Sequence, residues 1–191
     1  NLRDQAGRQI SSEFSPRVRH QVLSRLYSKF ITPWSGFLNG IHLIHVVESS
    51  GRHAWLEQLL YRLERDDFSQ SVVTLNSPGE MNEIYKGSAI EVISTTINKR
   101  GIWAFEAFWL IRKARRKGKR NFLVLQGHKA SIIGSIAARS MELDYSIIHH
   151  IQPKYFELMK ERRPYRALLH QLMYHFYIRH AKVIQSLSIE V

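Results

Sequence analysis

The sequence predicts an α/β fold, a Rossmann-like parallel sheet with helices on both faces. Two observations support this class. Short apolar segments of strand length alternate with segments whose apolar residues recur at helical spacing. The segments between successive strands span roughly ten to twenty residues, the length of a right-handed helical crossover between parallel strands. No internal repeat and no low-complexity tract interrupts the pattern.

Six strands and five helices are expected in this alternation. The strands span residues 41–48, 71–75, 89–95, 121–126, 145–151 and 182–187. The apolar face of the first helix is formed by Leu56, Leu59, Leu60 and Leu63. Ser77 is predicted to cap a second helix, with Pro78 in its first turn and Glu80 three residues after the cap. The remaining helices are expected at residues 101–117, around 132–141 and at 165–177.

The first forty residues differ from the rest of the chain. Residues 1–15 are polar and are expected to be loose, and residues 17–30 could form a short basic helix. Proline and glycine then break the pattern. We therefore divide the chain into a basic, partly disordered extension at residues 1–40 and one domain at residues 41–191.

The composition favours an anionic partner. Lys and Arg total 28 against 16 Asp and Glu, a net charge of +12, which suits nucleic acid, an acidic membrane face or a phosphorylated substrate. The absence of cysteine excludes disulfides and a cysteine-ligated zinc. The first ten residues lack the apolar segment of a secretory signal, and no apolar run approaches a membrane span. We expect a cytoplasmic protein, processed or a fragment because it lacks an initiator Met.

Three predicted loops follow strands and should lie at the ligand-binding edge of the sheet, at residues 49–53, 127–131 and 149–153. In the first, the backbone around Ser50, Gly51 and Arg52 could hold a phosphate or a sugar hydroxyl at a helix amino terminus. An ordinary strand-to-helix turn is an equally good interpretation. A single glycine does not make the G-x-G-x-x-G fingerprint, so NAD binding is not expected.

The second and third loops carry the candidate catalytic residues. His128 suits proton transfer near neutrality, Lys129 suits a phosphate, and Gly127 allows close backbone approach. A solvated helix cap is the alternative. His149 and His150 follow a strand, so one side chain should face each side of the sheet. They lack a third ligand of suitable spacing, and no metal is expected.

The other histidines are interpreted as structural. Within the first strand, His42 and His45 are expected to be packed or surface side chains rather than ligands, and three more fall on the last helix. Those three are His170, His175 and His180.

A basic cluster follows an aromatic segment. The aromatic part contains Trp103, Phe105, Phe108 and Trp109, and the basic cluster consists of Arg112, Lys113, Arg115, Arg116 and Lys117. This composition is typical of a segment that lies on an anionic membrane, so the cluster is predicted to face such a membrane. The predicted location is the inner face of the plasma membrane. A second basic stretch spans residues 154–166. A solvated helix face explains either stretch equally well. Nucleic acid is not expected, because no recognised binding module is present.

Several motifs, in this order, resemble the amino-terminal, acceptor-side domain of family 4 glycosyltransferases, which have the two-domain GT-B fold. They are His45-Val46-Val47-Glu48-Ser49 with Gly51, Val73-Thr74-Leu75 with Ser77-Pro78-Gly79-Glu80, Gln126-Gly127-His128-Lys129-Ala130-Ser131, Ile136-Ala137-Ala138-Arg139, Ile148-His149-His150, and Ala181 to Ser188. The resemblance covers about 150 residues, from 41 to 191.

The resemblance implies transfer of a sugar from a nucleotide-sugar donor to a glycan or lipid-linked acceptor, as in polysaccharide biosynthesis. It implies no metal and no cofactor besides the donor. The sequence departs from the family at Val124 and Gln126, where a histidine is often found, and in the single glycine of the first loop.

The chain stops where the resemblance places the donor-binding domain. We therefore expect the chain alone to be inactive, with the missing half in the same or a second chain, because a cleft enzyme needs both walls to position its reactants. The alternatives are a non-catalytic glycan- or membrane-binding module, or another Rossmann-like sugar-nucleotide enzyme. An epimerase or dehydrogenase would be of the latter kind.

Overall fold

The structure, a computed structural model, describes residues 40–65, 68–96, 102–149 and 164–186. The helix expected at 17–30, the second basic stretch up to residue 163, and His150 lie outside these ranges. The chain forms two compact units. One comprises residues 1–40 with His53–Phe68, and the other comprises Ile41–Arg52 with Ser69–Val191.

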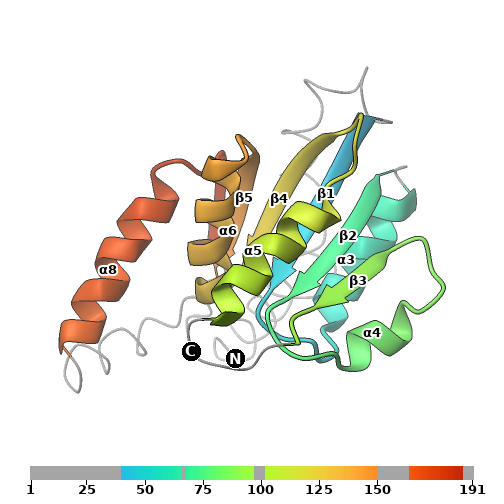
Figure 1. Ribbon diagram of the computed structural model, residues 1–191, viewed down its shortest axis with the longest axis horizontal. Helices are drawn as coiled ribbons and strands as arrows, with labels where there is room; N and C mark the ends of the chain where they lie inside the picture. The colour runs from blue at the N-terminus through green and yellow to red at the C-terminus, as the bar shows by residue number, and fades with distance from the viewer. Residues whose placement is uncertain (1–39, 66–67, 97–101, 150–163, 187–191) are drawn as a thin grey trace, which may run out of the picture. The chain divides into compact units, whose positions relative to one another are not determined.

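The second unit contains a six-stranded parallel sheet with strand order β3-β2-β1-β4-β5-β6 (Figure 1). Its strands are β1 (Ile41–Val47), β2 (Ser69–Thr74), β3 (Glu91–Ser94), β4 (Arg120–Gln126), β5 (Asp144–His149) and β6 (Val183–Ser186). This is the Rossmann strand order, so the predicted α/β class with a parallel sheet is confirmed. The order reverses between β1 and β4, and in such sheets ligands bind beyond the carboxyl ends of the strands at that point.

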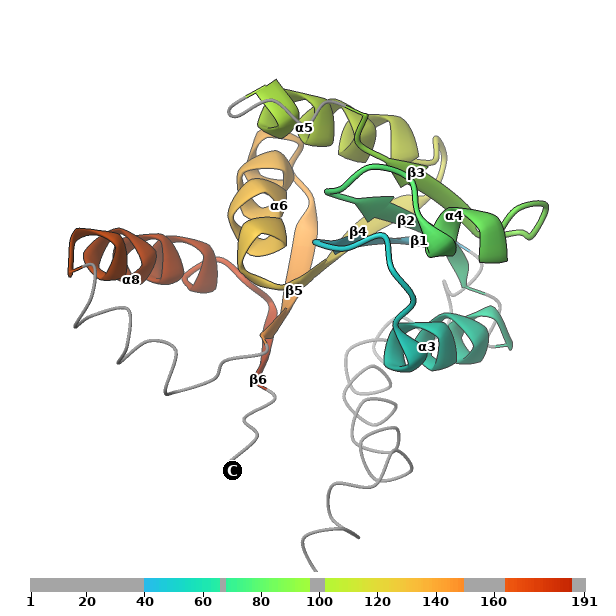
Figure 2. The ribbon, with the colours of Figure 1, turned by 90° about the horizontal axis from the view of Figure 1, so that it is seen from below.

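Five helices lie within the described residues. They are α3 (Ala54–Arg65), α4 (Glu80–Ile84), α5 (Ile102–Ala114), α6 (His128–Ser140) and α8 (Pro164–Ile178). In the first unit, the four leucines predicted to form the buried face of α3 are at most 5% exposed. In the second unit, α5 and α6 cover the same face of the sheet (Figure 2).

Two helices differ from their predicted bounds for local reasons. Helix α4 has only five residues and begins after Gly79, not after Ser77. The Gly79 N–H donates to Oδ1 of Asn82 (3.0 Å), which closes the first turn two residues later than the sequence signature indicated. Helix α5 ends at Ala114 instead of continuing to residue 117. The side-chain amide of Asn121 accepts from the Arg116 N–H (2.8 Å) and donates to the Arg116 carbonyl (3.1 Å), so the chain turns there.

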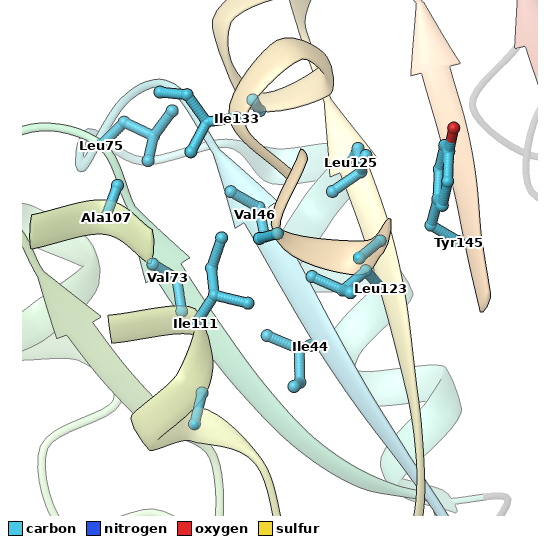
Figure 3. Close-up of a cluster of buried hydrophobic side chains, with 14 of the residues drawn as sticks. Ile44, Val46, Val73, Leu75, Ala107, Ile111, Leu123, Leu125, Ile133 and Tyr145 are labelled. Atoms are coloured by element: carbon cyan, nitrogen blue, oxygen red, sulfur yellow. The ribbon is translucent and has the colours of Figure 1, made fainter. Parts of the chain in front are cut away.

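The core of the second unit lies between the sheet and helices α5 and α6 (Figure 3). Alternate residues of the central strands point into it, and Ala107 and Ile111 of α5 meet them. The strand residues are Ile44, Val46, Val73, Leu123, Leu125, Tyr145 and Ile147. Helix α6 approaches the sheet closely at Gly134, where a Cβ would collide with the Leu125 side chain. Only a residue without a side chain allows this approach.

Candidate functional site at the carboxyl edge of the sheet

The first loop is held against the start of α4. The N–H of Met81 donates to the Ser50 carbonyl (3.0 Å), and the N–H of Arg52 donates to Oε2 of Glu80 (3.0 Å). Gly79 lies so close that a Cβ there would be 2.6 Å from the Ser50 hydroxyl oxygen. The loop backbone at Ser50, Gly51 and Arg52 is therefore fixed by contacts to the next strand-to-helix connection.

The second loop wraps around a carboxylate that the sequence analysis did not select. The N–H of Lys129 donates to Oε1 of Glu48 (2.7 Å), in the first turn of α6. Gly127 has φ +93°, and a Cβ on it would lie 2.5 Å from the same oxygen. Glycine is therefore required at position 127 both for its backbone conformation and for the approach of Glu48.

His128 is oriented by a helix far along the chain. Its Nδ1 lies 3.2 Å from the Tyr177 hydroxyl of α8, and the two rings meet edge to face with centroids 5.9 Å apart. Burial, together with the nearby Tyr174 and Glu48, raises the pKa of Tyr177, so the phenol keeps its proton at neutral pH. The Tyr145 hydroxyl donates to the Tyr177 carbonyl (2.7 Å) and fixes this part of α8 to the sheet.

The third loop begins beside the second. The N–H of Gly127 donates to the Ile148 carbonyl (3.2 Å), so the end of β5, at His149, lies next to the Gly127 turn. The structure thus brings the backbones of the first two predicted loops and the end of β5 to one edge of the sheet, whereas residues 150–153 of the third loop lie outside the described ranges. The side chain of His149 and all of His150 lie outside what the structure describes.

Three buried polar side chains lie among apolar ones on the face of the sheet opposite α5 and α6, near the same edge. Nε2 of Gln126 lies 3.4 Å from Nδ1 of His45. The other polar atoms of this pair, Oε1 of Gln126 and Nε2 of His45, have no hydrogen-bond partner within the described residues, and neither has the Ser146 hydroxyl. Burial lowers the pKa of His45 to about 4, so its imidazole is neutral. Gln126, at one of the two strand positions where the family often has a histidine, is therefore one of these buried polar side chains.

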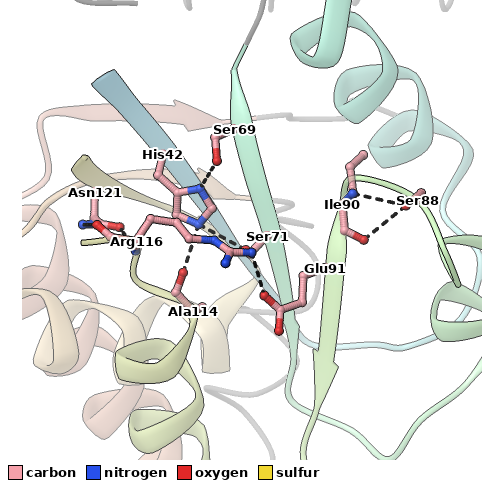
Figure 4. Close-up of polar contacts among 9 residues, drawn as sticks. All are labelled: His42, Ser69, Ser71, Ser88, Ile90, Glu91, Ala114, Arg116 and Asn121. Carbon is pink, nitrogen blue, oxygen red and sulfur yellow. Dashed lines mark hydrogen bonds and ion pairs between the residues drawn. The ribbon is translucent and has the colours of Figure 1, made fainter. Parts of the chain in front are cut away.

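His42 lies at the other end of β1 and is fully paired (Figure 4). Its Nδ1 lies 2.7 Å from the Ser69 hydroxyl, and its Nε2 lies 3.0 Å from the Ala114 carbonyl and 3.1 Å from the Ser71 hydroxyl. Burial, with a smaller effect of Arg116 and Lys119, lowers the pKa of His42 to about 4. Both strand histidines are buried, which is one of the two alternatives, packed or surface, that the sequence analysis left open.

The predicted membrane-facing cluster lies at the opposite end of the sheet from the three loops. Arg112, Lys113, Arg115, Arg116 and Lys117 are all exposed, and they precede β4, whereas Gly127 follows it. Seven strand residues separate the two ends, which is about 20 Å at ~3.3 Å per residue. Glu91 pairs with Arg116 (3.0 Å) in this region (Figure 4). The basic cluster is therefore not part of the site at the carboxyl edge.

Helix α5, which ends at this basic cluster, carries two exposed aromatic side chains. Phe105 and Trp109 are 80% and 58% exposed, one helical turn apart, and the ammonium of Lys113 lies 5.6 Å above the Trp109 ring. The opposite side of α5, with Ala107, Leu110, Ile111 and Ala114, is buried.

None of the described helices combines the length and apolarity needed to cross a membrane. Likewise, the described ranges hold no group of three side chains suited to bind a metal ion.

The strand order and the loops at its reversal point define a Rossmann-like domain. Comparison with solved structures supports this class: the chain is similar to MurG of Acinetobacter baumannii, a GT-B glycosyltransferase, with a TM-score of 0.50 and 13% sequence identity. The similarity covers 78% of this chain and 42% of that chain, so the protein spans less than half of its length. At this identity the likeness establishes the fold. No family model matches, and no curated protein matches.

MurG belongs to glycosyltransferase family 28, and not to family 4. The comparison therefore supports the GT-B part of the sequence resemblance and leaves family 4 as a proposal.

Two residues that contact the predicted site residues, Glu48 and Tyr177, were not selected from the sequence. Glu48 carried one available signal, because it directly follows a buried strand beside the switch point. Tyr177 carried none, because 49 residues separate it from His128.

Proposed function

We propose that this chain is the acceptor-binding half of a glycosyltransferase of the family 4 type, which moves a sugar from a nucleotide-sugar donor to a glycan or lipid-linked acceptor. The observation that carries the proposal is the meeting of the first two polar loops with the end of β5, beside the point where the strand order reverses, in a GT-B-like domain. The proposed reaction uses the nucleotide sugar as co-substrate and needs neither a metal nor another cofactor.

In this reaction His128 accepts a proton. The acceptor hydroxyl oxygen forms a bond to the anomeric carbon, the bond to the nucleotide diphosphate breaks, and the hydroxyl proton passes to Nε2 of His128. This role requires the tautomer in which Nδ1–H donates to the Tyr177 hydroxyl, an arrangement that the 3.2 Å distance allows. His150 is proposed as a second proton carrier.

The remaining site residues would bind the acceptor. The loop at Ser50, Gly51 and Arg52 offers backbone groups fixed by α4. The exposed Lys129, with Gly127 and His149, would contact the same acceptor from the other side of the switch point. Most contacts to the donor would come from a second domain, so we expect negligible transfer by this chain alone.

A transferase assay tests the proposal. The purified chain with radiolabelled nucleotide sugars and a membrane extract as acceptor should give no transfer, whereas the product of a coding region that continues beyond residue 191, or a mixture with a separate donor half, should transfer. In that complete enzyme, His128→Ala should lower kcat roughly a hundredfold or more. His180→Ala, which changes an exposed histidine on the same protein, should have little effect. A complete enzyme that transfers no sugar would contradict the function, and an active His128→Ala would remove only the role of His128.

A membrane-binding role is the second candidate function, as part of the enzyme or as a non-catalytic module. The exposed Phe105 and Trp109, with the neighbouring Arg112 and Lys113, give α5 an aromatic surface with a basic end. Such a helix can lie along an anionic bilayer with its aromatic side chains in the interface. The proposed location is the inner face of the plasma membrane.

Vesicle co-sedimentation tests this second candidate. The protein should bind vesicles that contain anionic phospholipid more tightly than neutral ones, and Phe105→Ser with Trp109→Ser should abolish binding. Ile136→Ser is the matched control, because Ile136 is 48% exposed on a different helix, α6. Equal binding to both vesicle types, or none, would exclude the membrane role.

A further inference from the structure

The amino terminus of α6 already holds a negative charge. The first N–H groups of a helix have no partner within the helix and attract anions. In α6 the capping residue is Gly127, which has no side chain to satisfy them. The Lys129 N–H donates instead to the carboxylate of Glu48, at 2.7 Å.

The sheet register fixes this carboxylate in place. Val47 pairs with Gln126, so Glu48 and Gly127 are the next residues on two adjacent parallel strands. Gly127 leaves no gap between them, because a Cβ at that position would lie 2.5 Å from Oε1 and 2.9 Å from Cδ of Glu48. Glu48 is also only partly exposed. The carboxylate is thus packed against the helix end rather than free in solvent.

We propose that Glu48 is a specificity-determining residue that occupies the anion-binding position of α6 and keeps phosphate groups away from it. A second anion would have to displace the carboxylate or approach it against charge repulsion. The part of the acceptor that faces the Gly127 turn is then an uncharged, hydroxyl-bearing sugar. This last statement rests on the proposed acceptor role, whereas the exclusion of anions does not.

Binding of inorganic pyrophosphate, followed at the backbone amides by two-dimensional NMR, tests the exclusion. In the unchanged protein, pyrophosphate should cause no saturable shift of the Gly127 and Lys129 amide signals. Glu48→Gln keeps the size of the side chain and an oxygen that can accept from Lys129, but removes the charge. This variant should bind pyrophosphate roughly tenfold more tightly or better, with shifts at both amides.

Glu80→Gln is the matched control. Glu80 also accepts a backbone N–H, from Arg52, in the neighbouring loop, so its replacement removes one negative charge from the same edge of the sheet. It should leave pyrophosphate binding at Lys129 unchanged. An equal gain in both variants would show a general charge effect and would overturn the specific role of Glu48.

Two further outcomes would also overturn the proposal. One is a saturable shift of the Lys129 amide signal when pyrophosphate is added to the unchanged protein. This measurement needs no variant and remains decisive if Glu48→Gln does not fold. The other is a folded Glu48→Gln variant without any gain in binding. Because none of these measurements requires sugar transfer, failure of the transferase assay leaves them interpretable, and their failure leaves the transferase function open.

Discussion

The two faces of the sheet differ in how fully their buried polar side chains are hydrogen-bonded. On the face covered by α5 and α6, the side chains are apolar over most of the strands, and the buried His42 has a partner for each ring nitrogen. On the opposite face, the buried His45, Gln126 and Ser146 each leave a polar atom without a partner among the described residues.

The unpaired atoms on the opposite face should lower the stability of the sheet. Most buried polar groups in proteins are hydrogen-bonded, and an unpaired one costs free energy. A sheet built only for stability would carry apolar side chains at these positions. Gln126 directly precedes the Gly127 turn, so these polar side chains lie beside the candidate site, among buried apolar ones such as Leu43, Val124 and Ile148.

The largest expected effect is acid destabilisation through the two histidines. Unfolded His titrates near 6.5 and binds protons below it, whereas His42 and His45 stay neutral in the folded protein down to about pH 4. Stability should therefore be highest above pH 6.5 and fall as the pH is lowered towards 4. Between pH 7 and pH 5 we expect a loss of roughly 2 kcal/mol for each histidine. Urea unfolding at the two pH values measures it.

A variant separates the contributions of the two faces to this acid effect. His45→Leu should remove about half of the pH dependence and leave the share of His42. An unfolding midpoint that does not change between pH 7 and pH 5 would contradict the burial of both imidazoles.

The next largest effect should come from the apolar face. Leu125 is fully buried against α6, so Leu125→Ala should lower the free energy of unfolding by about 3 kcal/mol through lost burial and a cavity. The control is Leu168→Ala on α8, where the side chain is 57% exposed and the change should be within about 0.5 kcal/mol. Similar losses in both variants, measured by chemical denaturation, would show that this face is not the main core of the unit.

The smallest effect on stability should come from the face opposite α5 and α6. Two buried serines, Ser146 on that face and Ser131 on α6, allow a matched comparison. The Ser146 hydroxyl has no described partner, so Ser146→Ala should be neutral or stabilising by up to about 1 kcal/mol. The Ser131 hydroxyl donates to the Gly127 carbonyl (2.6 Å), so Ser131→Ala should destabilise by about 1 kcal/mol. If Ser146→Ala proved the more damaging change in thermal unfolding, the hydroxyl would have a partner and the contrast between the faces would weaken.

The fold could be predicted because its elements follow from local patterns. The strands are continuous apolar segments, and their predicted bounds lie within about two residues of the observed ones for β1, β2, β3, β4 and β5, apart from the part of the fifth that is not described. Helix ends were less accurate, because side chains decide them. Good helix formers continue after α5 up to residue 117, but the helix ends at Ala114 because the side-chain amide of Asn121 binds the backbone of Arg116.

The site could be predicted only as loops. Their common edge follows from the rule for parallel sheets, and the sequence was sufficient to apply that rule to Gly127 and its neighbours. The partners inside the site depend on strand order and on helix α8. Neither the pairing of β1 with β4 nor the contact between His128 and Tyr177 has a local signature.

The contact between Glu48 and Gly127 has a consequence for how this protein can change over generations. Position 127 cannot gain a side chain while a glutamate occupies position 48, because the two would share the same space. A homologue with alanine or serine at position 127 should therefore carry a shorter residue at position 48 and a turn without the positive φ of Gly127. Positions 48 and 127 should therefore covary among homologues. A homologue in which Glu48 is replaced by an uncharged residue should be able to bind a phosphorylated acceptor at the same turn.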